Sequence, residues 1–338
     1  MDRKIKSSVQ IACCFFLVWY TASAETGSFI YPTNPAIVDD AVYISGHGVS
    51  RFQRLTLKPV WHVLAGLNTL EPVATPTAIL VGSTTGLHAL DPATGRNLWR
   101  IASKSTLFPP AAANNIAYIG GIDGSVRAVS IDSGHLVWRR DYGGWIYTPA
   151  IFQNRLVVGG KEGVLRGIDA KTGDQLWKKV LAQELVYRPV AVPGGRVVVT
   201  LFSGEVLMVD ASDGKIRWHV KGETPSFPPA ISNGRLYFGT FDGRVQARAL
   251  SDGHLIWEQQ LDGRLHYLPH ITNDVVLVGT NQTELAAYNA TTGKRLWHHK
   301  DIHELIAGPV VLNNKVVSFT ERKDVLSWPA SFLGGLSP

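Results

Sequence analysis

The chain is poor in cysteine. Cys13 and Cys14 are the only two cysteines in its 338 residues, and both lie inside an apolar run near the N-terminus. The residues before them do not resemble the leucine-rich box that precedes a lipidated cysteine. From residue 25 onward the chain can form no disulfide and carry no lipid anchor, so burial alone must stabilise it.

The N-terminal apolar run is too short to span a membrane. It extends from Val9 to Tyr20, whereas roughly 20 apolar residues are needed to cross a bilayer. It follows a basic start and is followed by small residues that end at Ala24. This order predicts a cleaved export signal over residues 1–24. We therefore expect a mature chain over 25–338 without a transmembrane anchor, located in the periplasm and peripheral to the outer membrane.

A concentrated charge of one sign is also absent. The formal net charge is +6, and removing residues 1–24 leaves +4, because that segment holds three basic residues and one acidic residue. No run of five or more lysines or arginines occurs. This dispersed surplus is typical of a solvated surface, so we expect no nucleic-acid partner.

What the chain has is a repeat. Tryptophans recur at intervals of 38, 39, 39, 41, 39 and 40 residues, and most of them close the same phrase, as in LVGSTTGLHALDPATGRNLW over 80–99. The seven tryptophans are Trp61, Trp99, Trp138, Trp177, Trp218, Trp257 and Trp297. A period near 40 with strand-like content in every copy indicates a radial array of small sheets.

One copy shows the expected strands. Between Pro149 and Trp177, short β-branched runs at 150–154, 155–158, 163–168 and 175–179 are separated by turn residues. Such runs are typical of hairpins in a meander. Several copies also have an Asp that begins a turn and a Gly that ends it, such as Asp91 and Gly95, Asp169 and Gly173, and Asp210 and Gly214, and we interpret these residues as turn builders. The closing Trp is predicted to pack against the neighbouring sheet and join adjacent blades.

The prolines that open each copy set the blade count. They are Pro35, Pro76, Pro110, Pro149, Pro189, Pro229, Pro269 and Pro309. The last copy ends without the Asp and Thr-Gly turn or a fourth strand. We therefore predict an all-β fold, a single eight-bladed β-propeller of four-stranded antiparallel blades, in which residues 25–31 close the ring by adding the outer strand of the last blade.

The phrase G-x-x-G-x-L-x-A-L-D-x-x-T-G-x-x-L-W resembles the PQQ-type propeller repeat, also called the tryptophan-docking motif. The resemblance covers essentially all of residues 25–338. Within this superfamily the chain is most similar to the BamB family, periplasmic lipoproteins of the outer-membrane β-barrel assembly machinery. It departs from that family in lacking a lipidated cysteine and in short inter-blade segments such as Leu181–Arg188.

The resemblance implies a non-catalytic protein-binding scaffold. It would support outer-membrane or envelope protein assembly as a monomer within a complex, with the assembly machinery or exported polypeptides as partners. Quinoprotein dehydrogenases share the repeat and hold a quinone over calcium, typically with a vicinal cysteine disulfide and an Asp base. Beyond residue 24 this chain has no cysteine, and turns account for nearly every Asp. We expect no catalytic residue and no cofactor. A quinone-dependent oxidoreductase or its accessory, and a periplasmic ligand-sensing domain, are the alternatives.

One pattern goes beyond the scaffold. Five consecutive copies carry an aromatic residue two positions before the opening proline, and the other three carry small residues. The aromatic residues are Phe108, Tyr147, Tyr187, Phe227 and Tyr267, and the small ones are Thr33, Ala74 and Ala307. Because each copy places this position alike, the rings are predicted to form an arc at one end of the central channel. With Trp145, Arg188 and His266 beside it, the arc either binds a peptide or aromatic ligand or wedges the blades apart.

Histidines do not indicate a metal site. Zinc needs three or four converging ligands. His298 and His299 are adjacent on a predicted strand and therefore point to opposite faces. We expect no bound metal.

Overall fold

The computed structural model describes residues 33–181, 183–265, 267–281, 284–300, 305–320 and 325–331, all within the unit Pro32–Pro338. The predicted export signal at 1–24 and the predicted closing strand at 25–31 lie outside these residues. In the described ranges the regular structure is β-strand, and no helix there is long and apolar enough to cross a membrane.

The described strands form seven antiparallel sheets. The first contains β1 (Ala36–Val38), β2 (Ala41–Gln53), β3 (Pro59–Ala74), β4 (Ile79–Ser83), β5 (Gly86–Leu90) and β6 (Asn97–Ala102). The second contains β7 (Ala111–Ala113), β8 (Ile116–Gly120), β9 (Ser125–Ser130) and β10 (Leu136–Asp141). The third contains β11 (Ala150–Phe152), β12 (Arg155–Val158), β13 (Val164–Asp169) and β14 (Gln175–Val180).

The remaining four sheets follow in chain order. The fourth contains β15 (Val190–Val192), β16 (Arg196–Thr200), β17 (Val206–Asp210) and β18 (Ile216–Val220). The fifth contains β19 (Ala230–Ser232), β20 (Arg235–Gly239), β21 (Arg244–Ala249) and β22 (Leu255–Gln260). The sixth contains β23 (His270–Thr272), β24 (Val275–Gly279), β25 (Leu285–Asn289) and β26 (Arg295–His299). The seventh contains β27 (Val310–Leu312), β28 (Lys315–Phe319) and β29 (Val325–Pro329).

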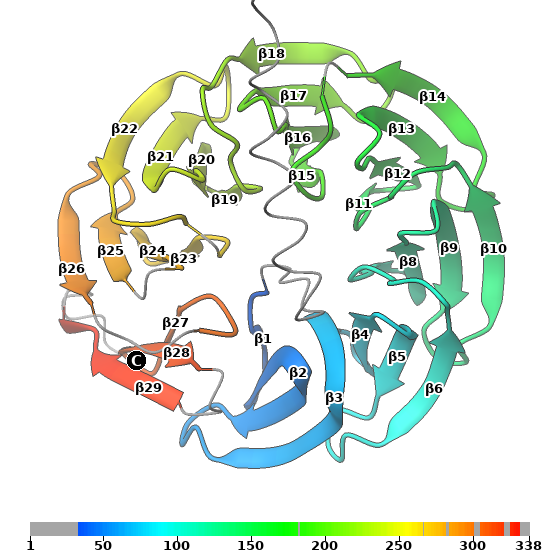
Figure 1. The fold of residues 1–338 in the computed structure, drawn as a ribbon, viewed down its shortest axis with the longest axis horizontal. Coiled ribbons are helices and arrows are strands. Elements are labelled where there is room, and N and C mark those ends of the chain that lie inside the picture. Colours follow the sequence, from blue (N-terminus) through cyan, green and yellow to red (C-terminus); the bar gives the residue numbers. More distant parts are fainter. Residues whose placement is uncertain are drawn as a thin grey trace, which may run out of the picture. The chain divides into compact units, whose positions relative to one another are not determined.

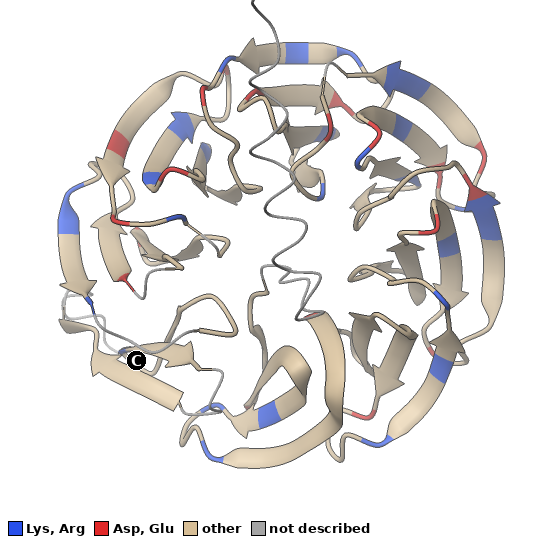
Figure 2. Ribbon diagram, viewed as in Figure 1, with Lys and Arg blue, Asp and Glu red and all other residues tan. Residues whose placement is uncertain are grey.

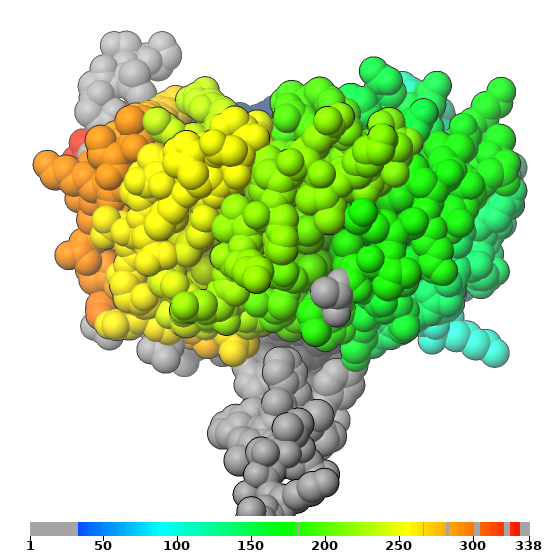
Figure 3. Space-filling view, turned by 90° about the horizontal axis from the view of Figure 1, so that it is seen from above, coloured from blue at the N-terminus to red at the C-terminus, as the bar shows by residue number. Residues whose placement is uncertain are grey.

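The sheets stand around a common axis, with the short first strand of each innermost and the last strand on the rim (Figure 1). Seen from the side, neighbouring sheets form a continuous wall over the yellow and green part of the chain (Figure 3). Lys, Arg, Asp and Glu are absent from β1, β7, β11, β15, β19, β23 and β27. Charge gathers instead on the outer strands and turns (Figure 2).

The first sheet has six strands because two of its elements bend. β2 doubles back at Gly46 and Gly48, whose φ angles are 146° and 95°, and the N–H of Arg54 donates to the carbonyl of Asp40 at 2.7 Å across the folded element. The N-terminal part of β3 pairs with β2 and its C-terminal part pairs with β4. Buried residues of β2 pack against those of β4 in one apolar cluster. The two parts of this sheet therefore face each other as separate layers.

The second copy begins at a different proline from the one predicted. Pro72 lies on β3 opposite Val81, whereas Pro76 lies in the bend between β3 and β4. The opening proline of this copy is therefore Pro72. The residue two positions before it is the buried Leu70 and not Ala74. A smaller difference concerns the strand predicted at 150–154, which ends at Phe152 because Gln153 adopts a φ of 50° in the turn.

The core lies between neighbouring sheets. Leu80 and Leu87 from the first sheet pack with Ile119 and Val129 from the second, all at 0% exposure. The alternation of strand side chains directs one set toward each neighbour, so every interior sheet contributes to two such layers. Burying apolar surface on both faces of each sheet is the main contribution to stability.

Tryptophan indoles join the sheets at the rim. Six indole N–H groups donate to a backbone carbonyl in the next copy, between 31 and 34 residues onward. The pairs are Trp61 to Pro92 (3.3 Å), Trp99 to Ile131 (2.7 Å), Trp138 to Ala170 (3.0 Å), Trp177 to Ala211 (2.9 Å), Trp218 to Leu250 (3.1 Å) and Trp257 to Ala290 (2.9 Å). Each acceptor directly follows the residue that begins the Asp and Thr-Gly turn.

The glycine of the same turn lies under the indole. At Gly173 the φ angle is +77°, and a Cβ there would be 2.8 Å from the Trp138 ring. Glycines 95, 134, 214, 253 and 293 face their indoles in the same way. The turn therefore needs glycine both for the left-handed backbone and for the space that the ring occupies.

The last two contacts around the ring are built differently. Trp297 lies 6.0 Å from the Trp328 ring of the seventh sheet, which lacks the Asp and Thr-Gly turn. Between the last and first sheets, Asn313 donates to the Arg54 carbonyl at 2.9 Å, and Phe52 contacts Phe319. The described residues thus bring the two ends of the array together without an indole at that contact.

Replacing Gly173 by Ala should destabilise the protein by about 2–4 kcal/mol, because left-handed strain of about 1–2 kcal/mol adds to overpacking against Trp138. The matched control is Gly234→Ala, whose φ is +70° with nothing within 4 Å of an added Cβ. Gly234→Ala should lower the unfolding free energy only by the left-handed backbone strain of about 1–2 kcal/mol. Urea unfolding of both variants measures the difference, and equal losses would contradict the role of the indole.

Candidate functional site

The predicted aromatic arc forms a chain of ring contacts where the chain enters the innermost strands. Phe108 meets Tyr147 edge-on at 5.1 Å, and Tyr147 lies 6.3 Å from Tyr187. Tyr187 stacks on Phe227 at 5.3 Å with an interplanar angle of 20°. The repeat therefore places one ring from each of four consecutive sheets side by side.

Most of these rings are buried. Phe108, Tyr147, Phe227 and Tyr267 are 0%, 5%, 1% and 5% exposed, and Tyr187 is half-buried. The Tyr267 hydroxyl donates to the Leu305 carbonyl of the following copy at 2.6 Å. These contacts favour the interpretation that the arc wedges between sheets.

The side chains beside the arc are more open. Trp145 is half-buried and carries the Lys161 ammonium 4.8 Å above its ring. Phe227 extends to Phe241 at 4.7 Å, and the Arg264 guanidinium lies 4.7 Å above Phe241. Such cation–π pairs are worth about 0.5–1 kcal/mol when exposed. His266 lies outside the described residues.

An ion pair joins two sheets on opposite sides of the axis. Arg188, two residues before β15, donates to both carboxylate oxygens of Glu71 on β3, at 2.8 and 3.3 Å. β3 and β15 lie across the axis from each other in Figure 1. The Glu71 side chain is 14% exposed and the Arg188 side chain is 24% exposed. This bidentate pairing fixes the orientation of the Arg188 guanidinium.

The sequence analysis named Arg188 but missed Glu71. Both residues directly precede the opening proline of their copy, once Pro72 replaces Pro76 as the start of the second copy. Opposite charges at the same repeat position were the signal that could have identified the pair.

The described residues do not fit a quinone held over calcium. Calcium takes six to eight oxygen ligands, yet in the described part of the chain no three His, Cys, Asp or Glu side chains converge. Glu71, near the axis, is bonded by Arg188. His298 contacts Glu284, whereas His299 packs against Trp328.

A half-buried histidine lies on an innermost strand. Burial lowers the pKa of His270, the first residue of β23, to about 4. The ring is therefore neutral in the folded protein at pH 7, where it provides hydrogen-bonding capacity without charge.

Four-stranded antiparallel sheets around an axis, joined by docking tryptophans, define a β-propeller built of PQQ-type repeats. The family model described as outer membrane protein assembly factor BamB matches residues 45–144, 83–226 and 203–327, and the chain belongs to this family. No curated protein matches the chain closely enough to count as a relative.

Solved structures share the fold at low identity. The computationally designed Ika8 protein has a TM-score of 0.76 at 18% identity, covering 88% of this chain and 95% of that one. BamB from Moraxella catarrhalis has a TM-score of 0.64 at 15% identity, and the match covers 78% of this chain and 91% of that one. Quinohemoprotein alcohol dehydrogenase from Comamonas testosteroni has a TM-score of 0.70 at 14% identity, and the match covers 85% of this chain and 70% of that one.

Replacing Tyr147 by Ala should cost about 3–5 kcal/mol, the usual loss for truncating a buried aromatic residue. Replacing Tyr187, which is half-buried, should cost less. Thermal and urea unfolding measure both, alongside partner binding. Lower stability with unchanged binding supports the wedge, whereas lost binding at unchanged stability would contradict it.

Acid should weaken the fold through His270. Its pKa is lowered from 6.5 to about 4, so between these values the unfolded state binds the proton and the folded state does not. Stability is therefore full above pH 6.5 and falls as the pH drops toward 4, by up to about 3 kcal/mol. Urea unfolding of His270→Asn should show a flatter profile over this range, and an identical slope would contradict the assignment.

Proposed function

We propose that this chain is an exported, non-catalytic scaffold that binds proteins in the periplasm during outer-membrane or envelope protein assembly. The match to the BamB family over residues 45–327 carries the proposal. The export signal at 1–24 and the monomeric state within a complex are part of the same proposal.

The packing near the arc supports a platform. Arc rings contact one another, and Arg188 is bonded to Glu71. Because these groups are engaged within the protein, recognition falls to the exposed loops around them, where the half-buried Trp145 and Lys161 lie. Aromatic side chains such as Trp145 are enriched at protein interfaces.

We also propose that the propeller has eight blades. The doubled β2 and the shared β3 supply two four-stranded meanders from the first sheet, and five complete sheets and the three-stranded seventh sheet follow. That residues 25–31 add a fourth strand to the three described strands of the seventh sheet remains the corresponding prediction.

The oxidoreductase alternative has its own test. The quinohemoprotein neighbour shares only the fold at 14% identity. Adding pyrroloquinoline quinone with calcium to the purified protein should leave the visible spectrum of the quinone unchanged. A saturable spectral shift would favour the alternative.

The scaffold is tested by photocrosslinking in cells. A photoreactive residue at Lys161, in the β12–β13 turn, should capture envelope proteins that mass spectrometry identifies. The matched control is Asp213, in the β17–β18 turn at the opposite end of the strands, which should capture few. Failure to recover any envelope protein from Lys161, or equal recovery from Asp213, would overturn the proposal.

A further inference from the structure

The surplus of positive charge is concentrated in one part of the ring. From β5 through β14, residues 86–180 hold 12 Lys or Arg and seven Asp or Glu, a net charge of +5. The rest of residues 25–338 holds 18 basic and 19 acidic residues, a net charge of −1. The sequence has no long basic run, so the concentration becomes visible only when the charges are assigned to the sheets.

Three consecutive outer strands carry much of this surplus. β6, β10 and β14 together hold five basic residues and one acidic residue. Figure 2 shows Lys and Arg on all three strands, whereas β22 carries an acidic residue. On the next outer strand, β18, Arg217 is paired with Asp210, and Lys215 in the turn before it is paired with Asp213. The surplus therefore ends at β14, and we call β6, β10 and β14 the basic rim.

The basic rim also exposes aliphatic side chains. A bulge before each docking tryptophan leaves Leu98, Val137 and Leu176 without a partner in the strand ladder. At the same position of later repeats, Ile256 and Leu296 pack against core clusters. Exposed aliphatic residues gathered on neighbouring strands indicate an interaction surface. Of the ten exposed large hydrophobic residues in the described ranges, five lie on the basic rim: Leu98 (41%), Leu136 (56%), Val137 (54%), Leu176 (48%) and Val180 (71%).

The cations of the basic rim are weakly engaged within the protein. Among the residues that the structure describes, none forms an ion pair with Arg100, Lys178 or Lys179. Arg139 pairs with Asp141 at 2.7 Å, and both side chains are exposed. Exposed pairs of this kind contribute little to stability. The basic rim therefore presents positive charge to an external anion.

Protection of the strand edges does not account for this pattern. Lysine on an edge strand discourages pairing with a second sheet. The equivalent outer strands β22 and β29, however, hold no Lys or Arg. Protection of an edge also does not call for exposed aliphatic residues beside the charges.

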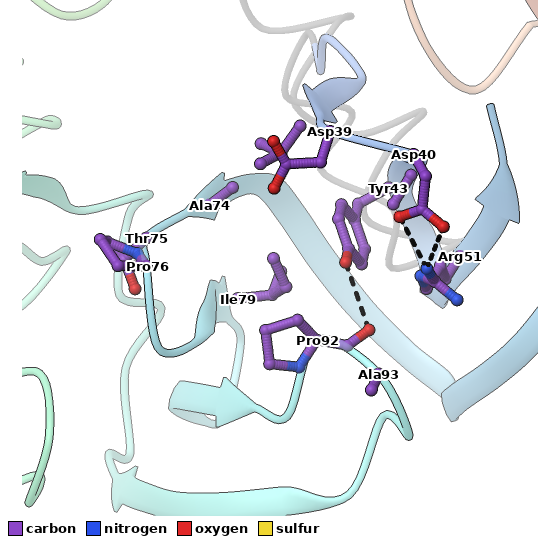
Figure 4. Close-up of a pocket in the computed structure, with 12 residues that line it drawn as sticks. Asp39, Asp40, Tyr43, Arg51, Ala74, Thr75, Pro76, Ile79, Pro92 and Ala93 are labelled. Atoms are coloured by element: carbon purple, nitrogen blue, oxygen red, sulfur yellow. Dashed lines mark hydrogen bonds and ion pairs between the residues drawn. The ribbon is translucent and has the colours of Figure 1, made fainter.

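The first repeat has the opposite charge. Residues 25–85 hold three basic and four acidic residues. Asp39 and Asp40 line a pocket at the β1–β2 turn, where Arg51 donates to Asp40 at 3.2 Å (Figure 4). Leu55 and Val60 of this repeat are 74% and 47% exposed. The first repeat therefore matches the basic rim in exposed aliphatic surface but not in charge.

We propose that the basic rim docks the protein on a membrane surface that contains anionic phospholipids. Its Lys and Arg side chains pair with the lipid phosphates, and its aliphatic side chains enter between the headgroups. Such binding strengthens with the apolar area buried and with the attraction between basic residues and anionic lipids.

The division of the surface favours lipid over a peptide. A peptide would need a groove or one continuous strand edge, whereas β6, β10 and β14 belong to three separate sheets. Mobile lipid headgroups adapt to a surface divided in this way. The inference goes beyond the proposed function and does not rest on it.

Flotation with lipid vesicles tests the proposal. The purified protein is mixed with phosphatidylcholine vesicles that contain or lack phosphatidylglycerol, at low and at high salt. It should float with the phosphatidylglycerol vesicles, and less so at high salt, because salt screens the attraction. No flotation with these vesicles at low salt, or equal flotation with phosphatidylcholine alone, would overturn the proposal. Binding to polyglutamate without binding to vesicles would also overturn it, because that result assigns the rim to an acidic polypeptide.

Charge reversal locates the binding. Lys178→Glu combined with Lys179→Glu should weaken binding to the anionic vesicles by about tenfold or more. The charge-matched control combines Lys294→Glu with Arg295→Glu, two exposed residues at the start of β26, and should bind like the unmodified protein. Every variant keeps the same N-terminal segment, so differences between variants report on the rim. Equal losses in the two double variants would contradict a defined docking surface.

Removal of the aliphatic side chains tests their insertion. Leu176→Ser combined with Val180→Ser should weaken binding by about threefold or more, and the remaining binding should be more sensitive to salt. The control combines Leu55→Ser with Val60→Ser, which removes a similar exposed aliphatic surface from the first repeat. This control should bind like the unmodified protein, and equal losses in both would contradict insertion of the rim.

Discussion

The structure depends on one contact, an indole of one repeat lying on the glycine turn of the next. Six times the indole N–H meets a carbonyl while the ring covers a glycine that has no side chain to displace it. Each contact buries a large ring and satisfies a polar group at once, which few other side chains can do. Because the contact always runs from one repeat to the next, the sheets between the two ends of the array both donate and accept, and the array has a defined order.

The first repeat differs from the others in its turn and in its contact with the neighbouring repeat. In it, Leu57 occupies the left-handed turn position that glycine holds in the six repeats that follow, with a φ of 56°, and Asn313 bonds the carbonyl that an indole would otherwise meet. Where the array must close, the repeat sequence changes, and the contact between neighbouring repeats changes with it.

Local signals predicted the fold well and the site only in part. Period, turn residues and β-branched runs identified the family and an all-β fold of four-stranded antiparallel sheets, and both were confirmed, because hairpins are encoded within about 15 residues. Pro76 was mistaken for the opening proline because the second copy has two prolines around its inner strand. Glu71 and Arg188 are 117 residues apart, so only the closed ring brings them together. Function is least predictable, because repeats specify a scaffold and little about its partner.

A double-mutant cycle between Trp138 and Gly173 tests the central contact most directly. The unfolding free energies of Trp138→Leu, Gly173→Ala and the double variant are measured in urea. If the glycine is required because the indole lies on it, the alanine costs less once the indole is gone, and the coupling energy should be about 1–3 kcal/mol. Additive losses within about 0.5 kcal/mol would show that the two residues act independently and would contradict the account.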